Sequence, residues 1–295
     1  MSSPPLTLVA LAAGLGSRFG GTKQLAEVGP HGEAVLDYTI HDARLVGFER
    51  FVLVVRTDLA DPVTEHLRAI HGDDLDAALV LQDRFGPTRP KPWGTGHAML
   101  AAATELHGPF GVVNADDFYG RRGLEVLADA LRAPAAATEH HLVAYRLAAT
   151  LSPGGTVSRG VCTVDDAGNL ADLVETAAIA RGSDGRIHGE AGGRPVVLED
   201  DHPVSMNLLG LQPSILDELA TAWASFRDEA TEDAEFILPG VLGTLADQGR
   251  ATVRVHRTDA VWHGVTYASD AAEVRAAIAA EVAAGTYPAP LGGRP

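Results

Sequence analysis

The residues near the start of the chain that are best suited to chemistry are the glycines and cations of "GLGSRFGGTK", residues 14 to 23. They form the pattern GxGxRxGGxK directly after an apolar stretch, where a first strand is expected to turn into a helix. Glycines in such a turn expose backbone N–H groups and let the chain approach an anion closely. Together with the two cations, Arg18 and Lys23, this arrangement predicts a phosphate-binding loop.

Two common phosphate-binding motifs do not fit this loop. A P-loop requires GxxxxGK followed by Ser or Thr, whereas here one residue separates Gly21 from Lys23, and Gln24 follows. A dinucleotide fingerprint requires GxGxxG and an acidic residue after the second strand, whereas the chain has GxGxxxG and Arg56. A Rossmann-type NAD(P)-binding oxidoreductase is therefore a weaker alternative, as is a structural turn with two solvated cations. The whole pattern resembles the signature loop of the sugar-phosphate nucleotidyltransferases.

A second glycine-rich stretch, "KPWGTGHAMLAA" (91 to 102), resembles the uracil-binding segment of bacterial N-acetylglucosamine-1-phosphate uridylyltransferases. The resemblance implies that Gly94 and Thr95 bind the base together with a preceding glutamine, which here is Gln82. An amide offers a donor and an acceptor, which suits the edge of a pyrimidine ring. The intervening "DRFGPTRPKPW" makes the spacing longer than in those enzymes, so Gln82 also fits an ordinary strand-end residue. His97 is interpreted as a helix-packing residue rather than a catalyst.

Paired carboxylates follow a third apolar stretch, "VVNADDFYG" (112 to 120). Open α/β sheets bind ligands at this edge, beyond the carboxyl ends of their strands. The resemblance implies that one aspartate holds Mg²⁺, a hard cation that prefers oxygen ligands. We assign this role to Asp116, with Asp117 as the alternative or as a helix-capping residue. Asn114 is expected to contact the substrate.

Two stretches resemble the acceptor side of the same enzymes. "ADLVETAAI" (171 to 179) implies that Glu175 binds sugar hydroxyls, and "VSMNLLG" (204 to 210) implies that Asn207 faces the sugar. Thr176 stands where the thymidylyltransferases have a lysine for the sugar phosphate, and Arg181 is a possible substitute.

The second metal ligand is not assigned by the resemblance. In "VWHGVTYASD" (261 to 270) the expected position falls on Thr266, which is a poor ligand. His263 and Asp270 are the other candidates, and water could also fill the position.

Taken together, the resemblance implies the reaction NTP + sugar 1-phosphate → NDP-sugar + pyrophosphate, with Mg²⁺ as cofactor and UTP or dTTP as the expected nucleotide. The segment formed by Leu11, Ala13, Gly14 and Gly16 would bind the nucleotide, while Arg18 and Lys23 would neutralise its phosphates. The acceptor phosphate would attack the α-phosphorus in line, so the protein has to hold two polyanions together. A nucleotide sensor without catalytic activity and a transferase acting on a non-sugar phosphate, such as a cyclitol phosphate, are the open alternatives.

Composition is consistent with this interpretation. The 295 residues are 46% hydrophobic, and the formal charge of −16 argues against nucleic-acid or anionic-membrane partners. Both lysines of the chain, Lys23 and Lys91, lie in the glycine-rich stretches. No apolar run approaches the roughly 18 residues of a membrane span, and the start lacks a basic signal-peptide region, so we expect a cytoplasmic protein. Cys162, in the apolar "GVCTV", is expected to be a buried thiol.

The elements that must position these residues alternate between apolar strands and amphipathic helices over the first 150 residues, which predicts a mostly parallel sheet covered by helices. Around "DDAGN" (165 to 169) two strands are expected to form an antiparallel insertion, followed by a loop over 181 to 203. The fold class predicted is α/β, and the resemblance implies a GT-A-like, Rossmann-like fold. We expect one domain with a nucleotide-binding half (1 to 150), an acceptor half (151 to 270), and a C-terminal helix with a frayed tail (270 to 295).

Overall fold

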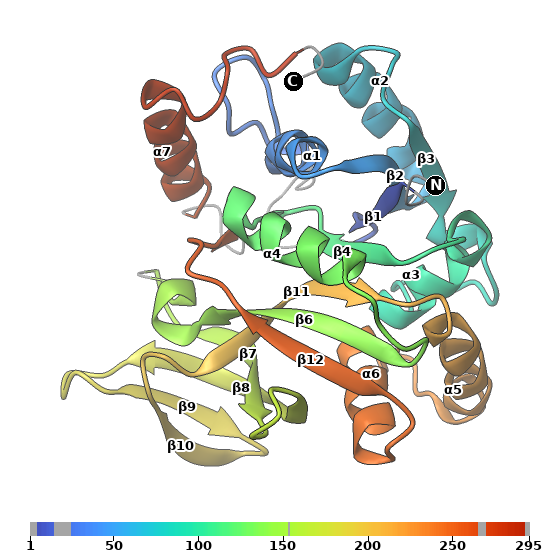
Figure 1. Cartoon of the computed structure of the whole chain (residues 1–295), viewed down its shortest axis with the longest axis vertical. Coiled ribbons are helices and arrows are strands. Elements are labelled where there is room, and N and C mark those ends of the chain that lie inside the picture. The colour runs from blue at the N-terminus through green and yellow to red at the C-terminus, as the bar shows by residue number, and fades with distance from the viewer. Residues whose placement is uncertain (1–4, 15–24, 153, 265–269, 293–295) are drawn as a thin grey trace.

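A computed structural model describes residues 5–14, 25–152, 154–264 and 270–292 of the chain. Within these ranges the protein has an 11-stranded mixed sheet with the strand order β10-β9-β8-β7-β11-β4-β1-β2-β3. Strand β6 pairs with both β11 and β12 beside this path. Figure 1 shows the N-terminal strands with their helices in the upper half and β7 to β10 in the lower half.

The nucleotide-binding half is built from parallel strands: β1 (Leu6–Leu11), β2 (Phe48–Val55), β3 (Ala77–Leu81) and β4 (Phe110–Asn114). The helices that follow are α1 (Val35–Leu45), α2 (Ala60–His71), α3 (Thr95–Ala101) and α4 (Gly120–Arg132). Strands β1, β2 and β4 consist mainly of buried apolar residues, as expected for parallel strands that are covered on both faces.

The remaining strands are mostly antiparallel: β6 (Glu139–Arg146), β7 (Val157–Val164), β8 (Leu170–Arg181), β9 (Ile187–Ala191), β10 (Arg194–Leu198) and β11 (Pro203–Leu211). Strand β12 (Thr252–Arg257) pairs in parallel with β6, and β5 (Asp117–Phe118) forms a separate ribbon with β13 (His263–Gly264). The last helices are α5 (Ile215–Glu229), α6 (Leu238–Asp247) and α7 (Asp270–Ala283). The predicted fold class, including the antiparallel insertion, is confirmed.

Strand β11 joins the two halves of the sheet. Its first half, at Val204 and Ser205, pairs with β7, and its last residues, from Leu209, pair with β4. Between them the register along β6 shifts, and Asn207 adopts a φ of +61°, which is rare for a residue other than glycine. This bend lets one strand belong to both parts of the sheet.

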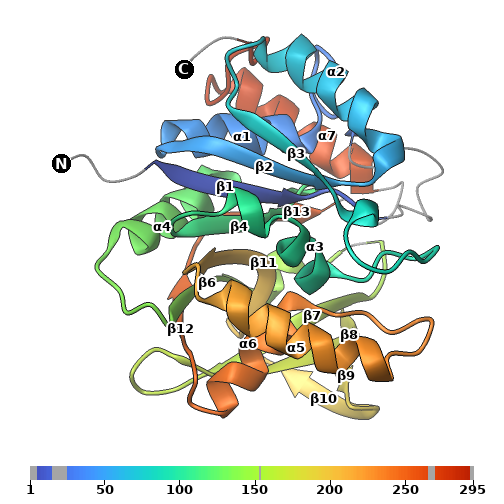
Figure 2. The ribbon, with the colours of Figure 1, turned by 90° about the vertical axis from the view of Figure 1, so that its right-hand side faces the viewer.

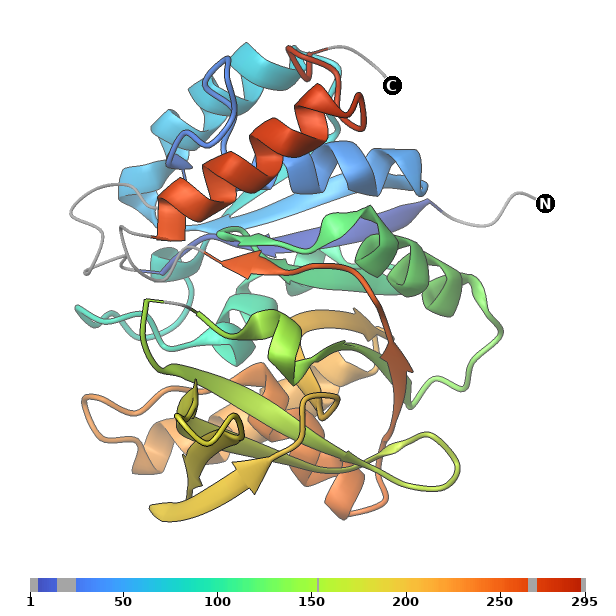
Figure 3. The same ribbon diagram turned by 90° about the vertical axis from the view of Figure 1, so that its left-hand side faces the viewer.

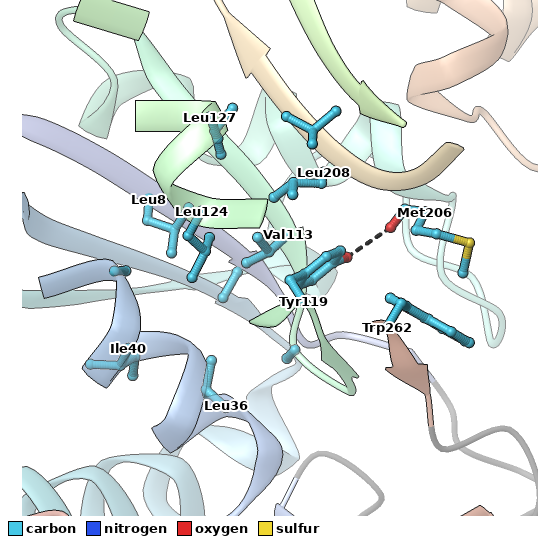
Figure 4. Packing of buried hydrophobic residues seen from close by; sticks show 14 of the residues in the cluster. Leu8, Leu36, Ile40, Val113, Tyr119, Leu124, Leu127, Met206, Leu208 and Trp262 are labelled. Carbon is cyan, nitrogen blue, oxygen red and sulfur yellow. Dashed lines mark hydrogen bonds between the residues drawn. The ribbon is translucent and has the colours of Figure 1, made fainter. Parts of the chain in front are cut away.

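Two main hydrophobic clusters cover the faces of the sheet. One contains residues of α1, α2 and α4, and its packing around Tyr119 is shown in Figure 4. The other lies under α3, α5 and α6, which group together in Figure 2. A third, smaller cluster packs α7 against α1 and the β5 ribbon, and Figure 3 shows α7 beside α1. In the described residues, no helix is long and apolar enough to cross a membrane.

Two local expectations were wrong. The segment 181–203 is not a loop: β9 and β10 form a hairpin whose turn contains Gly192 and Gly193, both with positive φ. The tail is not frayed up to residue 292, because Tyr287 and Leu291 are 4% and 2% exposed and the Tyr287 hydroxyl donates to Asp42 Oδ2 at 2.6 Å. The buried position of Cys162 is confirmed, and burial raises the pKa of its thiol to about 12.

Candidate functional site

The candidate site lies beyond the carboxyl ends of the parallel strands, where open α/β sheets bind ligands. Leu11 ends β1, Ala13 is buried, and Gly14 is exposed at the start of the signature loop. Gly16, Arg18 and Lys23 lie outside the described residues, so their predicted roles remain predictions.

Arg56, at the end of β2, holds the backbone at the start of this loop. Its Nη1 donates to the carbonyl oxygens of Ala13 and Gly14, at 3.2 and 2.9 Å. Its Nε and Nη2 donate to the two carboxylate oxygens of Asp58, at 3.0 and 2.8 Å, which fixes the guanidinium. In the sequence, Arg56 counted only against a ribose-binding acid, so this positioning role was missed.

A cavity of about 570 Å³ opens beside Arg56. Gln82, Trp93 and His97 line it, together with further cations, among them Arg89, whose guanidinium lies 3.8 Å from the centre of the Trp93 ring. The volume is within the usual range for small-molecule pockets. Aromatic and cationic walls suit a nucleotide, whose base stacks and whose phosphates are anionic.

Gln82 forms the inner wall of this cavity. Its Nε2 donates to the Gly94 carbonyl at 2.9 Å and lies 3.3 Å from His97 Nδ1. An amide nitrogen can only donate, so Oε1 is the atom of this amide that remains for a ligand. His97 is fully buried, with its ring 4.8 Å from that of Trp223, and burial lowers its pKa to about 4. This environment agrees with a neutral packing residue.

The glycines before α3 pack against the protein itself. Gly94 has a φ of +107°, and a Cβ at this position would lie 2.6 Å from the backbone oxygen of Phe236. Gly96 N donates to that same oxygen at 2.9 Å, and Thr95 Oγ1 accepts from Leu238 N at 2.9 Å. The GTG sequence is therefore needed for the close approach of the segment before α6, whatever further contact it makes with a base.

Three predicted residues meet at the end of β4. Asn114 Nδ2 donates to Asp117 Oδ2 at 2.8 Å, and Asn207 Nδ2 approaches Asn114 Oδ1 at 3.5 Å. Tyr119 supports them, because its hydroxyl donates to the Met206 carbonyl at 2.8 Å (Figure 4) and accepts from Asn114 N at 3.0 Å. Burial raises the pKa of Tyr119 well above its usual value, so the hydroxyl stays protonated as a donor.

The two aspartates differ in their surroundings. Asp117 is 8% exposed and bound by Asn114, whereas Asp116 is half-buried in the turn between β4 and β5. Helix α4 has Tyr119 as its N-cap without a side-chain capping bond, so the capping role considered for Asp117 is wrong.

The second stretch with metal candidates lies beside these aspartates. β13 pairs with β5 so that Gly264 stands opposite Asp117 and His263 opposite Phe118. Opposed residues share a face of an antiparallel ribbon, so His263 lies on the Phe118 face and not on that of Asp117. Thr266 lies outside the described residues, and Asp270 opens α7.

Glu175 lies two strands away from Asn207. It stands opposite Gly160 on β7, and Gly160 stands opposite Ser205 on β11. Burial raises the pKa of the Glu175 carboxyl, and the charge of Arg159 opposes this rise. Arg181 does not join this row: it donates to the Gly185 carbonyl and to Asp200 Oδ2 near the β8–β9 turn.

The donor set at the end of β4 fits a hard cation. Asp116 and Asp117 offer carboxylate oxygens and Asn114 an amide oxygen, which are ligands that Mg²⁺ accepts. Among the described residues, no three His, Cys, Asp or Glu side chains are grouped to hold a metal by themselves. This arrangement suits an ion that is shared between one or two carboxylates and the phosphates of a nucleotide.

Comparisons with known proteins agree with this geometry. Residues 8–145, which include most of β1 and all of β2 to β4, match the family model described as the MobA-like NTP transferase domain. No curated protein matches the sequence. The resemblance to nucleotidyltransferases is thus confirmed for the half of the chain that contains the signature loop.

Two solved structures have a similar fold. The inositol-1-phosphate CTP transferase from T. maritima is 15% identical, with a TM-score of 0.64, over 94% of this chain and 98% of that one. HddC from Yersinia pseudotuberculosis is also 15% identical, with a TM-score of 0.58, over 92% of this chain and 99% of that one. At this identity the likeness establishes the fold, including its antiparallel half.

Proposed function

We propose that this chain, whose residues 8–145 match the model of the MobA-like NTP transferase domain, transfers a nucleoside monophosphate from UTP or dTTP to a phosphate acceptor. The acceptor is a sugar 1-phosphate or a related small phosphate. The other product is pyrophosphate. The observation that carries the proposal is the chain of contacts from Asn207 through Asn114 to Asp117, next to the end of the strand that enters the signature loop. These contacts bring a carboxylate and two amides together, which supports a proposal in which both substrates meet at this point.

The proposed chemistry is an in-line displacement. An oxygen of the acceptor phosphate forms a bond to the α-phosphorus, and the bond from this phosphorus to the bridging oxygen of pyrophosphate breaks, so that pyrophosphate leaves with the electron pair. A phosphate monoester is already ionised near neutral pH. The reaction therefore needs no general base, and the protein contributes by positioning and by neutralising charge.

Each part of the site has a role in this proposal. Backbone N–H groups from Gly14 to Gly16 and the cations Arg18 and Lys23 bind the triphosphate, while Arg56 keeps the start of the loop in place. Asp116 or Asp117 would hold Mg²⁺, which stabilises the negative charge that develops on the phosphates.

The base and the acceptor are bound on opposite sides of the phosphates. Gln82 Oε1 is available to accept from N3–H of uracil or thymine in the 570 Å³ cavity. The 4-amino group of cytosine would also satisfy this acceptor, and one structural neighbour is an inositol-1-phosphate CTP transferase, so CTP and inositol 1-phosphate belong in the test. Glu175 and Asn207 bind the hydroxyls of the acceptor.

The test is a pyrophosphate-release screen of the protein with Mg²⁺. It combines ATP, GTP, CTP, UTP and dTTP with a panel of sugar 1-phosphates and inositol 1-phosphate. Release that requires UTP or dTTP together with an acceptor supports the proposal. Preference for a purine nucleotide overturns the assignment of the base, and nucleotide binding without release in any combination indicates a sensor instead of an enzyme.

A further inference from the structure

The loop between β3 and α3, residues 83–93, forms one wall of the 570 Å³ cavity. It is the stretch that makes the spacing before the GTG sequence longer than in the enzymes that this chain resembles. Pro87, Pro90 and Pro92 have no backbone N–H, so the loop has few donors with which to hold its own conformation. Side chains therefore have to fix its place beside the cavity.

Arg89 fastens this loop in two directions. Within the loop, its Nε donates to the Lys91 carbonyl at 2.6 Å and its Nη2 to the Pro92 carbonyl at 2.8 Å. Towards the segment that leads into α6, its Nη1 donates to the Glu232 carbonyl at 3.0 Å and its Nη2 to the Ala234 carbonyl at 2.7 Å. Four of the five N–H groups of this guanidinium thus donate to backbone oxygens, which leaves one for a ligand.

The same guanidinium packs on the Trp93 ring, 3.8 Å from the ring centre. A guanidinium over an indole is a favourable cation–π pair. The indole Nε1 of Trp93 donates to the Pro87 carbonyl at 2.7 Å, and the centre of its ring lies 5.1 Å from that of Trp223. The Trp93 ring is therefore held at its face by Arg89 and at its N–H by the first part of the loop.

Trp93 connects these contacts to the residues that would bind the base. Its carbonyl accepts from Phe236 N at 2.7 Å, and the carbonyl of Gly94, the next residue, accepts from Gln82 Nε2 at 2.9 Å. Arg89 holds the chain just before Phe236, so both bonded segments depend on the same guanidinium. A shift of Trp93 would carry the Gly94 carbonyl with it and turn the Gln82 amide, whose Oε1 is the acceptor for the base in the proposed function.

We propose that Arg89 is a positioning residue for the nucleotide base: it fixes the Trp93 wall of the cavity and, through the residue after Trp93, the orientation of the Gln82 amide. The inference rests on the proposed function, in which this cavity holds the base. Lys91 links the same two segments more weakly, because its ion pair with Glu235, at 2.9 Å, is 41% and 47% exposed. The contacts of Arg89 are charge-assisted bonds in a forked geometry that an ammonium group cannot reproduce.

Binding measurements on Arg89→Gln and Arg89→Lys test this role. The probes are the nucleotide that the wild-type protein binds most tightly, expected to be UTP, and inorganic triphosphate, which has the phosphates without a base; both are measured with Mg²⁺. In both variants the dissociation constant for the nucleotide should rise about tenfold, because ordering the loop then opposes binding of the base. The dissociation constant for inorganic triphosphate should stay unchanged. Arg68→Gln, which removes an exposed arginine of α2 that pairs with Asp73, is the matched control and should alter neither value.

The outcomes separate this inference from the proposed function. Equal weakening of nucleotide and triphosphate binding would overturn the positioning role, as would full nucleotide affinity in Arg89→Lys, which keeps the charge without the fork. Wild-type nucleotide affinity in both variants also overturns it and leaves the nucleotidyltransferase proposal standing. If the wild-type protein binds none of the five nucleotides of the screen, the proposed function fails, and this inference fails with it. If Arg89→Gln does not fold, Arg89→Lys decides alone.

Discussion

Replacing Asn207 with glycine or with alanine separates its backbone role from its side-chain role. The residue has a φ of +61° at the bend where β11 changes partners. The left-handed conformation costs an ordinary L-residue about 1–2 kcal/mol, whereas glycine adopts it freely and asparagine tolerates it. The side-chain contact to Asn114 Oδ1, at 3.5 Å, is at the limit of a hydrogen bond and adds little to stability.

The backbone cost and the weak side-chain contact give different expectations for stability and for substrate binding. By urea unfolding, Asn207→Ala should be about 1 kcal/mol less stable than Asn207→Gly. Both variants lose the amide that we propose binds the acceptor. Both should therefore raise KM for the acceptor by a similar factor, about tenfold, with little change in KM for the nucleotide. The reasoning fails if the glycine variant is as unstable as the alanine variant, or if it keeps the wild-type KM for the acceptor.

Three further predictions concern the charges of the site and of the core. Lys23→Ala should lower kcat about 10²–10³-fold while the affinity for the nucleotide changes less, and Lys23→Arg should restore kcat only partly. Equal losses in nucleotide affinity and in kcat would contradict a role of Lys23 in neutralising charge in the transition state. Asp116→Asn should abolish activity at ordinary Mg²⁺, and the activity should return in part at high Mg²⁺ or with Mn²⁺. Asp117→Asn should lower activity less in the same assay; a larger loss in Asp117→Asn would exchange the two roles. The free energy of unfolding should fall as the pH drops from 6.5 towards 4, because burial lowers the pKa of four histidines to about 4. In this range the unfolded chain binds more protons than the folded chain, which costs ~1.4 kcal/mol per pH unit for each histidine. The hydrogen bond from His66 to Asp37 raises the His66 pKa despite its burial, so the contribution of this residue changes above pH 6.5 and stays constant in this window. A melting temperature that is the same at pH 5 and pH 7 would contradict the assignment of these histidines, which are His41, His97, His140 and His141.

The sequence predicted the parallel half well because its signals are strong. Strands β1, β2 and β4 are apolar runs, each followed by a segment with helical periodicity. The glycine motif follows β1, and the aspartates follow β4. The hairpin of β9 and β10 was missed because its strands have only five residues each and lie in a segment, 181–203, that is rich in glycine, proline and charge. β13 is too short, at two residues, to give any periodicity.

The roles that depend on three-dimensional contacts could not be predicted in the same way. Arg56 acts through backbone carbonyls that lie 42 and 43 residues away in the chain. The tail is anchored by the Tyr287 hydroxyl on Asp42, which is a long-range polar contact without a local pattern. Arg159 stands opposite Thr176 through the register of β7 on β8, and that register appears only once the strands are paired.

The central claim, transfer of an intact nucleoside monophosphate, is tested most directly by following the label from UTP or dTTP carrying ³²P at either the α or the γ position. With an acceptor identified by the pyrophosphate screen, we predict that the α label appears in the nucleotide-linked acceptor and the γ label in pyrophosphate. Both should depend on Mg²⁺, and both should form about 10²–10³-fold more slowly in Lys23→Ala. Appearance of the γ label on the acceptor, or as orthophosphate before any pyrophosphatase is added, would contradict the proposal.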